Sequence, residues 1–281
     1  MHKILLLGAN GLLGSRIEEV LKNDPTVKLF STTRDESSEF YFDYNTMSLR
    51  SLLKKTRPDV VINCIVVTDI RKTWSYFFKI NALLPIKLAL IGFEKNIKIL
   101  HFSTDAVFPK SSRKRTEISL PFPSTKYGVS KLLGDLSILS CIVIRTSFVG
   151  FSESTDNSNG LAARIYNSEI GSNFVIEKNI LWNGITVDIL AELTRIIAKD
   201  TTIRKGLFHL FSSTPILKIQ LVEMLAKKLN RRDLIIEQTD KQESLGFILA
   251  TSKDKQISIW WEAVGYLRIP SIEDLLIEMR S

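Results

Sequence analysis

The sequence predicts an α/β protein built on a Rossmann-type, doubly wound parallel sheet, followed by a smaller α+β lobe. Two observations predict this fold. Apolar, strand-like runs alternate with helix-like segments through the first half of the 281-residue chain, which is typical of a parallel sheet covered by helices on both faces. A glycine-rich turn, Gly8 to Gly14, directly follows the first of these runs, as it does in dinucleotide-binding βαβ units.

The predicted elements alternate in order from the N-terminus. Lys3 to Leu7 is a short apolar run that ends at a glycine, and similar continuous runs predict the later strands. Apolar residues at helical spacing predict the segments between them. The predicted strands are 3–7, 27–33, 59–64, 98–103 and 141–146, and the predicted helices are 11–22, 49–55, 81–96 and 126–139.

The pattern changes after Gly150. A polar stretch at 152–160 (SESTDNSNG) precedes segments of irregular order, among which 188–199 and 219–229 are amphipathic helices. A last helix begins at Ser271, with acidic residues in its first turn. We therefore divide the chain into a dinucleotide-binding domain, 1–150, and a smaller substrate-binding lobe, 151–281, with some segments returning to the main domain. Trp260 and Trp261 are expected to pack the two together rather than to stack on a nucleotide base.

The composition is that of an ordinary soluble globular protein, with 44% hydrophobic and 24% charged residues. No apolar run approaches the roughly 18 residues of a membrane span, and no signal peptide is recognisable, so we expect a cytoplasmic protein without membrane association. Cys64 and Cys141 lie in apolar runs and are expected to be buried free thiols. The three histidines are far apart in the sequence, and no metal site is expected.

The net charge of +8 favours acidic partners. Lysine and arginine are concentrated in two segments, 110–115 (KSSRKR) and the four cations at 227, 228, 231 and 232. We expect both segments to be solvated surface. No helix-turn-helix, zinc-finger or RNA-binding motif accompanies them, so nucleic acid is not an expected partner. A phosphorylated small molecule fits the basic balance.

The glycine-rich turn predicts a dinucleotide site. Gly8, Gly11 and Gly14, with Asn10 between them, allow a tight turn, close approach of backbone N–H groups to a pyrophosphate, and close packing of the helix on the strand. The second predicted strand has no acidic residue for a ribose hydroxyl, and Arg34 stands at its tip. A guanidinium pairs with a 2′-phosphate, which favours NADP and leaves NAD possible, because Asp35 follows directly.

Tyr127 and Lys131 are four residues apart at the start of a predicted helix, so their side chains share one face. An ammonium beside a phenol lowers the pKa of the phenol from about 10 toward neutrality, which suits an acid–base catalyst. Ser103, Thr104 and Asp105 end a strand upstream. The combination with the glycine-rich turn predicts an oxidoreductase site.

Six motifs in order resemble the extended short-chain dehydrogenase/reductases, and among these the dTDP-4-dehydrorhamnose reductase family. They are GANGLLG at 8–14, VINC at 61–64 with Thr68 after it, Asn81-Ala82, STDAVF at 103–108, YGVSK at 127–131 and IRTSFVG at 144–150. The resemblance covers residues 1–150 well and continues loosely through 182–186 and 206–210.

The resemblance implies a role for each motif. Tyr127 would be the proton donor, Lys131 would hold the nicotinamide ribose, and Thr104 would hydrogen-bond the reacting oxygen. The cofactor would also meet Gly11, Leu12 and Leu13 at its pyrophosphate, Asp43 and Tyr44 at its adenine, and Val66, Val67 and Thr68 along its channel. Asp105 and Phe148, with Thr104, would face the substrate.

Three departures from the family pattern fall on the substrate side. Ala106 replaces an aromatic residue, Arg71 and Trp74 stand where an acidic pair is usual, and the Arg-Pro and Leu-Asp signature is missing from 249–256. The resemblance implies an NADP-dependent reductase of a nucleotide-linked 4-keto-6-deoxy sugar in surface polysaccharide synthesis, and it leaves a homodimer open. The alternatives are a non-catalytic regulatory subunit, like that of methionine adenosyltransferase, and an epimerase or dehydratase of the same superfamily.

Overall fold

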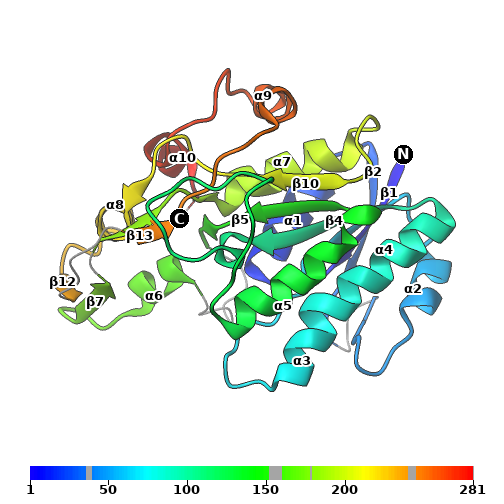
Figure 1. Ribbon diagram of the computed structural model, residues 1–281, viewed down its shortest axis with the longest axis horizontal. Helices are drawn as coiled ribbons and strands as arrows, with labels where there is room; N and C mark the ends of the chain where they lie inside the picture. The colour runs from blue at the N-terminus through cyan, green and yellow to red at the C-terminus, as the bar shows by residue number, and fades with distance from the viewer. Residues whose placement is uncertain (36–39, 152–159, 178, 240–244, 281) are drawn as a thin grey trace.

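The structure, a computed structural model, describes residues 1–281 apart from 36–39, 152–159, 178, 240–244 and 281. A six-stranded sheet in the order β10-β5-β4-β3-β1-β2 forms its centre, and all neighbouring strands are parallel (Figure 1). The strands are β1 (His2–Leu7), β2 (Val27–Thr32), β3 (Val60–Asn63), β4 (Lys98–Thr104), β5 (Ile142–Thr146) and β10 (Gly206–His209). The predicted Rossmann-type, doubly wound sheet is confirmed.

Alternating side chains of each strand enter two separate cores. On β1, Ile4 and Leu6 join one cluster, while Leu5 and Leu7 join the other. All four are fully buried, because a parallel sheet covered on both faces has no solvent side. The continuous apolar run that predicts β1 therefore reflects burial on both faces.

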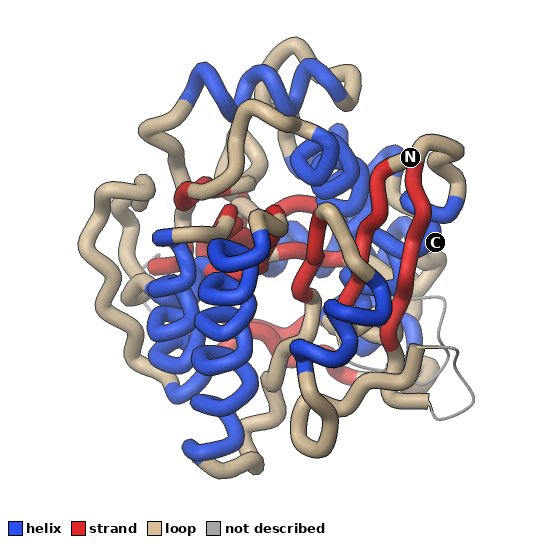
Figure 2. Tube along the Cα trace, turned by 90° about the vertical axis from the view of Figure 1, so that its right-hand side faces the viewer, coloured by secondary structure: helices blue, strands red, loops and turns tan. Residues whose placement is uncertain are grey.

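Helices cover both faces of the sheet (Figures 1 and 2). The first core holds α1 (Leu12–Lys22), α7 (Val187–Lys199) and α9 (Asp254–Ala263), and the second holds α2 (Leu49–Thr56) and α4 (Leu84–Lys95). In Figure 1 the helix α5 (Lys126–Gly134) lies beside α4, in front of the sheet.

The second half adds small sheets and helices at one end of the main sheet. β6 (Phe148–Val149) pairs with β9 (Ile185–Thr186), β7 (Asn173–Glu177) with β12 (Ile235–Thr239), and β8 (Ile180–Trp182) lies between β11 (Ile216–Leu217) and β13 (Leu245–Phe247). Three helices accompany these strands: α6 (Leu161–Asn167), α8 (Lys218–Lys228) and α10 (Ile272–Glu278). The division at residue 150 stays a prediction. Most of the polar stretch at 152–160 lies outside the described residues.

The helix expected at 81–96 begins earlier than predicted. The Thr73 side chain accepts a hydrogen bond from the backbone N–H of Tyr76 and caps α3 (Trp74–Phe78). A π-helical turn, Lys79–Leu83, then continues into α4. Within the described residues, 74–95 is one helical segment long and apolar enough to span a membrane, yet more than half of its most apolar stretch is buried in the fold.

Trp260 joins the last part of the chain to the main sheet. Its ring centroid lies 4.8 Å from that of Phe208 on β10, and its indole Nε1 donates to Asp200 Oδ2 at 3.0 Å. Trp260 and Trp261 are both fully buried, so the pair packs inside the protein, as the sequence predicts. Both cysteines are free, but Cys64 is only partly buried, whereas Cys141 is inaccessible.

Candidate active site

The order of the strands reverses between β1 and β3, because β1 is hydrogen-bonded to both β2 and β3. Ligands of doubly wound sheets bind at such a point, outside the carboxyl ends of the strands. Gly8 directly follows β1 there with φ +83°, and a Cβ on it would lie 3.1 Å from the Ile65 backbone nitrogen after β3. A Cβ on Gly14 would lie 2.0 Å from the Gly8 carbonyl oxygen. Only glycine fits at positions 8 and 14 of this turn.

The rest of the turn begins α1. Gly11 is the N-cap of α1 and donates its backbone N–H to the Gly8 carbonyl at 3.2 Å. Asn10 is exposed and Leu12 is half-buried. The side chain of Leu13 is buried in the first core, so only its backbone can take part in holding a pyrophosphate.

Arg34 lies two residues past the end of β2 and is exposed. Thr32, the last residue of β2, pairs with Leu7, and its hydroxyl accepts a hydrogen bond from the Gly8 N–H at 3.4 Å. Arg34 therefore belongs to the same sheet edge as the glycine-rich turn. Its neighbours at 36–39 are not described.

Asp43 and Tyr44 differ in their surroundings. The Asp43 carboxylate accepts hydrogen bonds from the backbone N–H and the side-chain amide of Asn45, at 2.7 and 2.9 Å. Tyr44 packs against the second core, with Lys87 5.5 Å from its ring centroid. The Tyr44 hydroxyl is buried with no hydrogen-bond partner in the described part of the chain.

The loop after β3 carries Val66, Val67 and Thr68 along the reversal point, and Asn81 holds it in place. The Asn81 side chain accepts from the Val67 N–H and donates to the Val67 carbonyl, both at 2.9 Å. Its amide also donates to Ser130 Oγ at 3.0 Å. Asn81 is fully buried in the π-helical turn and ties this loop to α5. The sequence motif marks Asn81, but this role was not predicted.

Tyr127, Thr104 and Asp105 meet at the carboxyl end of β4. The side chain of Thr104 lies close enough to the Tyr127 phenol to influence its pKa, and Thr104 Oγ1 donates to Asp105 Oδ1 at 3.1 Å. Burial raises the pKa of Tyr127 to about 12 and that of Asp105 to about 6. Tyr127 is thus a protonated phenol near neutral pH.

The predicted lowering of the Tyr127 pKa is wrong for this structure, because burial raises this pKa and the Lys131 ammonium is bound elsewhere. Lys131 Nζ donates to the Phe102 carbonyl at 2.5 Å and lies 3.3 Å from His101 Nε2. Burial lowers the pKa of Lys131 to about 8, against an opposing effect of Asp135. Lys131 and Tyr127 share a helix face, but the lysine ammonium contacts the Phe102 carbonyl and His101 on β4.

A buried ion pair lies below this group. Arg145 Nε donates to Asp135 Oδ2 at 2.9 Å, and both side chains are less than a tenth exposed. The guanidinium also lies over the ring of Phe108, 5.1 Å from its centroid. A lone buried charge here costs several kcal/mol, and the pairing offsets this. The pair fixes the start of η3 (Asp135–Leu139), a 3₁₀ turn where the sequence predicted continued α-helix.

Ser147 and Trp182 lie on the other side of Asp105. Trp182 Nε1 donates to Ser147 Oγ at 2.7 Å, and the Ser147 side chain lies close enough to the Asp105 carboxyl group to lower its pKa, against the larger effect of burial. Phe148 follows on β6 and is half-buried against the first core. Ser147 and Trp182 were not predicted as site residues, although both fall in segments that carry the resemblance.

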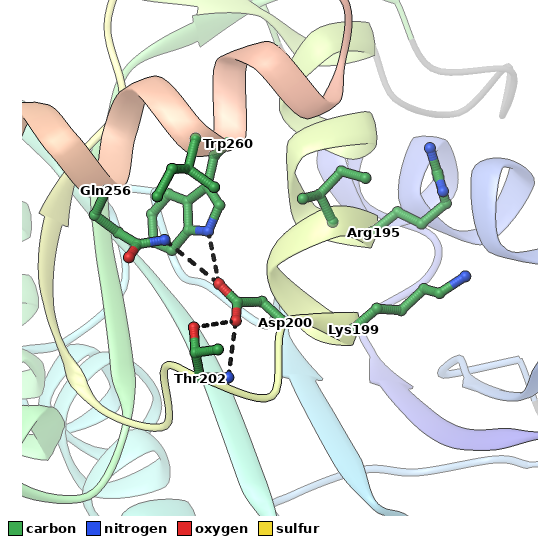
Figure 3. Close-up of a pocket in the computed structure, with 8 residues that line it drawn as sticks. Arg195, Lys199, Asp200, Thr202, Gln256 and Trp260 are labelled. Atoms are coloured by element: carbon green, nitrogen blue, oxygen red, sulfur yellow. Dashed lines mark hydrogen bonds between the residues drawn. The ribbon is translucent and has the colours of Figure 1, made fainter.

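A surface pocket elsewhere is lined by α7 and α9 and holds a volume of about 440 Å³ (Figure 3). Asp200 there accepts hydrogen bonds from Thr202, Gln256 and Trp260. Lys199 and Arg195 point away from Asp200 (Figure 3) and pair with Asp24, at 2.9 and 3.7 Å. These polar groups satisfy one another, and the pocket is lined by none of the predicted site residues.

The chain matches a family model over most of its length. A family model described as the RmlD substrate binding domain matches residues 1–244. The chain is 30% identical over 158 residues to the "Probable low-salt glycan biosynthesis reductase Agl14" of Haloferax volcanii. It is 29% identical over 155 residues to a dTDP-4-dehydrorhamnose reductase of Shigella flexneri. These alignments cover 50% and 52% of this chain and 52% and 51% of the relatives, so the chain spans about half the length of the curated relatives it matches.

Solved structures share the fold over nearly the whole chain. A dTDP-4-dehydrorhamnose reductase from Clostridium acetobutylicum matches with a TM-score of 0.77 and 20% identity, covering 99% of this chain and 98% of that one. The enzyme of the same name from Bacillus anthracis, in complex with NADP, matches with a TM-score of 0.76 and 17% identity over 99% and 98% of the two chains. At these identities the likeness shows the fold alone.

Proposed function

Since the chain belongs to the RmlD substrate binding domain family, we propose that it is an NADP-dependent reductase of a nucleotide-linked 4-keto-6-deoxy sugar. The match to this family confirms the resemblance given by the six motifs. The observation that carries the proposal is the meeting of Tyr127, Thr104 and Asp105 at the carboxyl end of β4. This group lies on the sheet edge where the glycine-rich turn lies.

The residues of the turn fit a dinucleotide. A Cβ at Gly14 would overlap the Gly8 carbonyl, so the helix can approach the strand this closely only without a side chain at position 14, and the N–H groups at the start of α1 suit a pyrophosphate. Arg34 is the group we assign to the 2′-phosphate of NADP, with NAD as a weaker ligand. When bound, the nicotinamide supplies a hydride to the keto carbon.

Tyr127 supplies the proton. With a pKa raised to about 12, the phenol stays protonated across the physiological range and can donate to the oxygen that gains charge during reduction. Thr104 orients the same oxygen and is held by Asp105. We assign Lys131 to the ribose of the cofactor, which requires its Nζ to leave the Phe102 carbonyl and His101.

The proposed substrate is a nucleotide sugar, with surface polysaccharide synthesis in the cytoplasm as the setting. Support comes from the names of the relatives, which include a glycan biosynthesis reductase and dTDP-sugar reductases. The three substrate-side departures leave the sugar and the nucleotide to be identified by assay.

The test is oxidation of NADPH, followed at 340 nm, with dTDP-, UDP- and GDP-linked 4-keto-6-deoxy sugars as substrates. We expect turnover with at least one of them, and loss of that turnover in Tyr127→Phe. Turnover with any of them excludes a purely regulatory subunit. NADPH binding without turnover across the whole panel would contradict the proposal.

A further inference from the structure

Three cations converge on the substrate side of Asp105, on elements that the proposed chemistry does not use. Lys110 follows the STDAVF segment, Arg164 lies on α6, and Lys218 is the first residue of α8. Their charges act on one another, because Arg164 and Lys110 both lower the pKa of Lys218, after burial as the first cause. Glu177 and Asp105 oppose this lowering. These residues are therefore close in space although they are far apart in the sequence.

Strand pairing explains why Lys218 lies near Asp105. Leu217, the residue before it, pairs with Leu181 on β8, and Ile216 pairs with Trp182. Trp182 donates to Ser147 Oγ at 2.7 Å, and the Ser147 side chain lies close enough to Asp105 to influence the pKa of its carboxyl group. β8 thus links the start of α8 directly to the side chains around Tyr127.

The other two cations are held by contacts of their own. Lys110 Nζ lies 2.8 Å from Glu177 Oε2, so this pair is nearly neutral. Arg164 lies over the ring of Phe174 on β7, with its guanidinium carbon 5.2 Å from the ring centroid. A cation–π contact orients a guanidinium without neutralising it.

Two positive charges are left over. Within the described part of the chain, neither Arg164 nor Lys218 forms an ion pair or donates a side-chain hydrogen bond to another residue. Lys218 is only partly exposed, so its ammonium loses hydration without gaining a hydrogen-bond partner among the described residues, although Glu177 and Asp105 act on it through their charges. Partly desolvated cations held close together form a site that a polyanion can stabilise.

We propose that Lys218 and Arg164 bind the diphosphate of the nucleotide-sugar substrate, with Lys110 at the rim beside Glu177. This inference rests on the proposed function and names the groups by which the site takes a nucleoside diphosphate rather than a neutral sugar. The diphosphate bridges the two unneutralised cations, and the sugar extends past Ser147 toward Asp105, Thr104 and Tyr127.

The test measures binding of unreactive probes to the full chain, with saturating NADPH present so that the dinucleotide site is filled. The probes are dTDP, UDP, GDP and thymidine, titrated by calorimetry at low and at high salt. We expect at least one diphosphate to bind, thymidine to bind far more weakly, and the affinity to fall as salt rises.

Lys218→Met and Arg164→Met should each lower the affinity for the diphosphate by roughly 10- to 100-fold, the range expected when a charged hydrogen bond is lost. Lys218→Arg should retain most of the affinity. The matched control is Lys227→Met, an exposed lysine on the same helix, which should leave binding unchanged. Far-UV circular dichroism and a thermal melt show whether each variant folds.

Diphosphate affinity that is the same in wild type, Lys218→Met and Arg164→Met would overturn the inference, and so would failure of all three diphosphates to bind. NADPH affinity, measured separately, tests the proposed function instead. Loss of diphosphate binding with intact NADPH binding supports this site whether or not a sugar substrate has been found.

Discussion

The Nζ of Lys131 lies 3.3 Å from Nε2 of His101, deep inside the protein, and both side chains are almost inaccessible. The other ring nitrogen, Nδ1, lies 3.1 Å from the amide of Asn63. Burial and the lysine charge hold the pKa of His101 well below its usual range, so the ring is neutral. His101 and the Phe102 carbonyl therefore determine where Lys131 rests.

Substitution of Tyr127 by Phe removes the proposed proton donor and keeps the ring. We expect turnover to fall at least about 100-fold, the scale of general acid catalysis, with NADPH affinity nearly unchanged. The measurement is steady-state NADPH oxidation together with fluorescence titration of the cofactor. Tyr166→Phe, at an exposed tyrosine on α6, is the control. Retention of wild-type turnover in Tyr127→Phe removes this residue from the mechanism.

Substitution of Lys131 by Ala should weaken both cofactor binding and turnover. The ammonium is assigned to the ribose, and once it has left the Phe102 carbonyl for that position its charge favours the developing phenolate of Tyr127. Cofactor titration and steady-state kinetics separate the two effects. If NADPH affinity survives and only turnover falls, the assigned ribose contact is incorrect.

Substitution of Arg34 by Ala tests the choice of cofactor. A guanidinium on a 2′-phosphate at an exposed site is worth roughly 1.5–3 kcal/mol, or about 10- to 100-fold in affinity. Arg34→Ala should lose most of the preference for NADPH and leave NADH affinity within a few-fold of wild type. Arg232→Ala, at another exposed arginine, should change neither. A wild-type preference for NADH would show that Asp35 faces the ribose instead.

Substitution of Gly14 by Ala tests the turn. The new Cβ would lie 2.0 Å from the Gly8 carbonyl oxygen, so the strand and the helix must separate. We expect a loss of roughly 1–3 kcal/mol in the free energy of unfolding and strongly weakened cofactor binding. Gly11→Ala places a Cβ at 3.5 Å from the same oxygen and should fold nearly as well as wild type in urea denaturation. Equal stability of the two variants would contradict the steric account.

Asp105 makes the stability depend on pH. Burial raises its pKa in the folded protein to about 6, from an ordinary 3.8. Between these values the unfolded chain releases a proton that the folded protein keeps, so the free energy of unfolding falls as pH rises from about 4 to 6. This shift in the pKa corresponds to about 3 kcal/mol in the free energy of unfolding. Asp105→Asn removes this contribution. Urea denaturation at pH 4, 5, 6 and 7 measures the free energy of unfolding of both proteins, and the difference between them should grow up to pH 6 and then stay constant.

The sheet could be predicted from the sequence because the strands at its centre are buried on both faces and contain continuous apolar runs, such as 60–62 in β3 and 142–144 in β5. The start of α3 could not, since Trp74 to Phe78 is an aromatic run without helical periodicity, and its cap is a single side-chain contact from Thr73. Tyr127, Thr104 and Asp105 follow from motifs. The resting place of Lys131 depends on His101, a strand residue whose side-chain neighbours only the fold determines.

Transfer of deuterium from NADPH labelled at C4 of the nicotinamide is the most direct test of the reductase proposal. The labelled cofactor is incubated with the 4-keto sugar nucleotide that supports turnover, and the product is analysed by mass spectrometry and NMR. The account predicts one deuterium at C4 of the sugar with wild type, and almost none at equal times with Tyr127→Phe. A product without deuterium, or with deuterium at another carbon, would contradict the account.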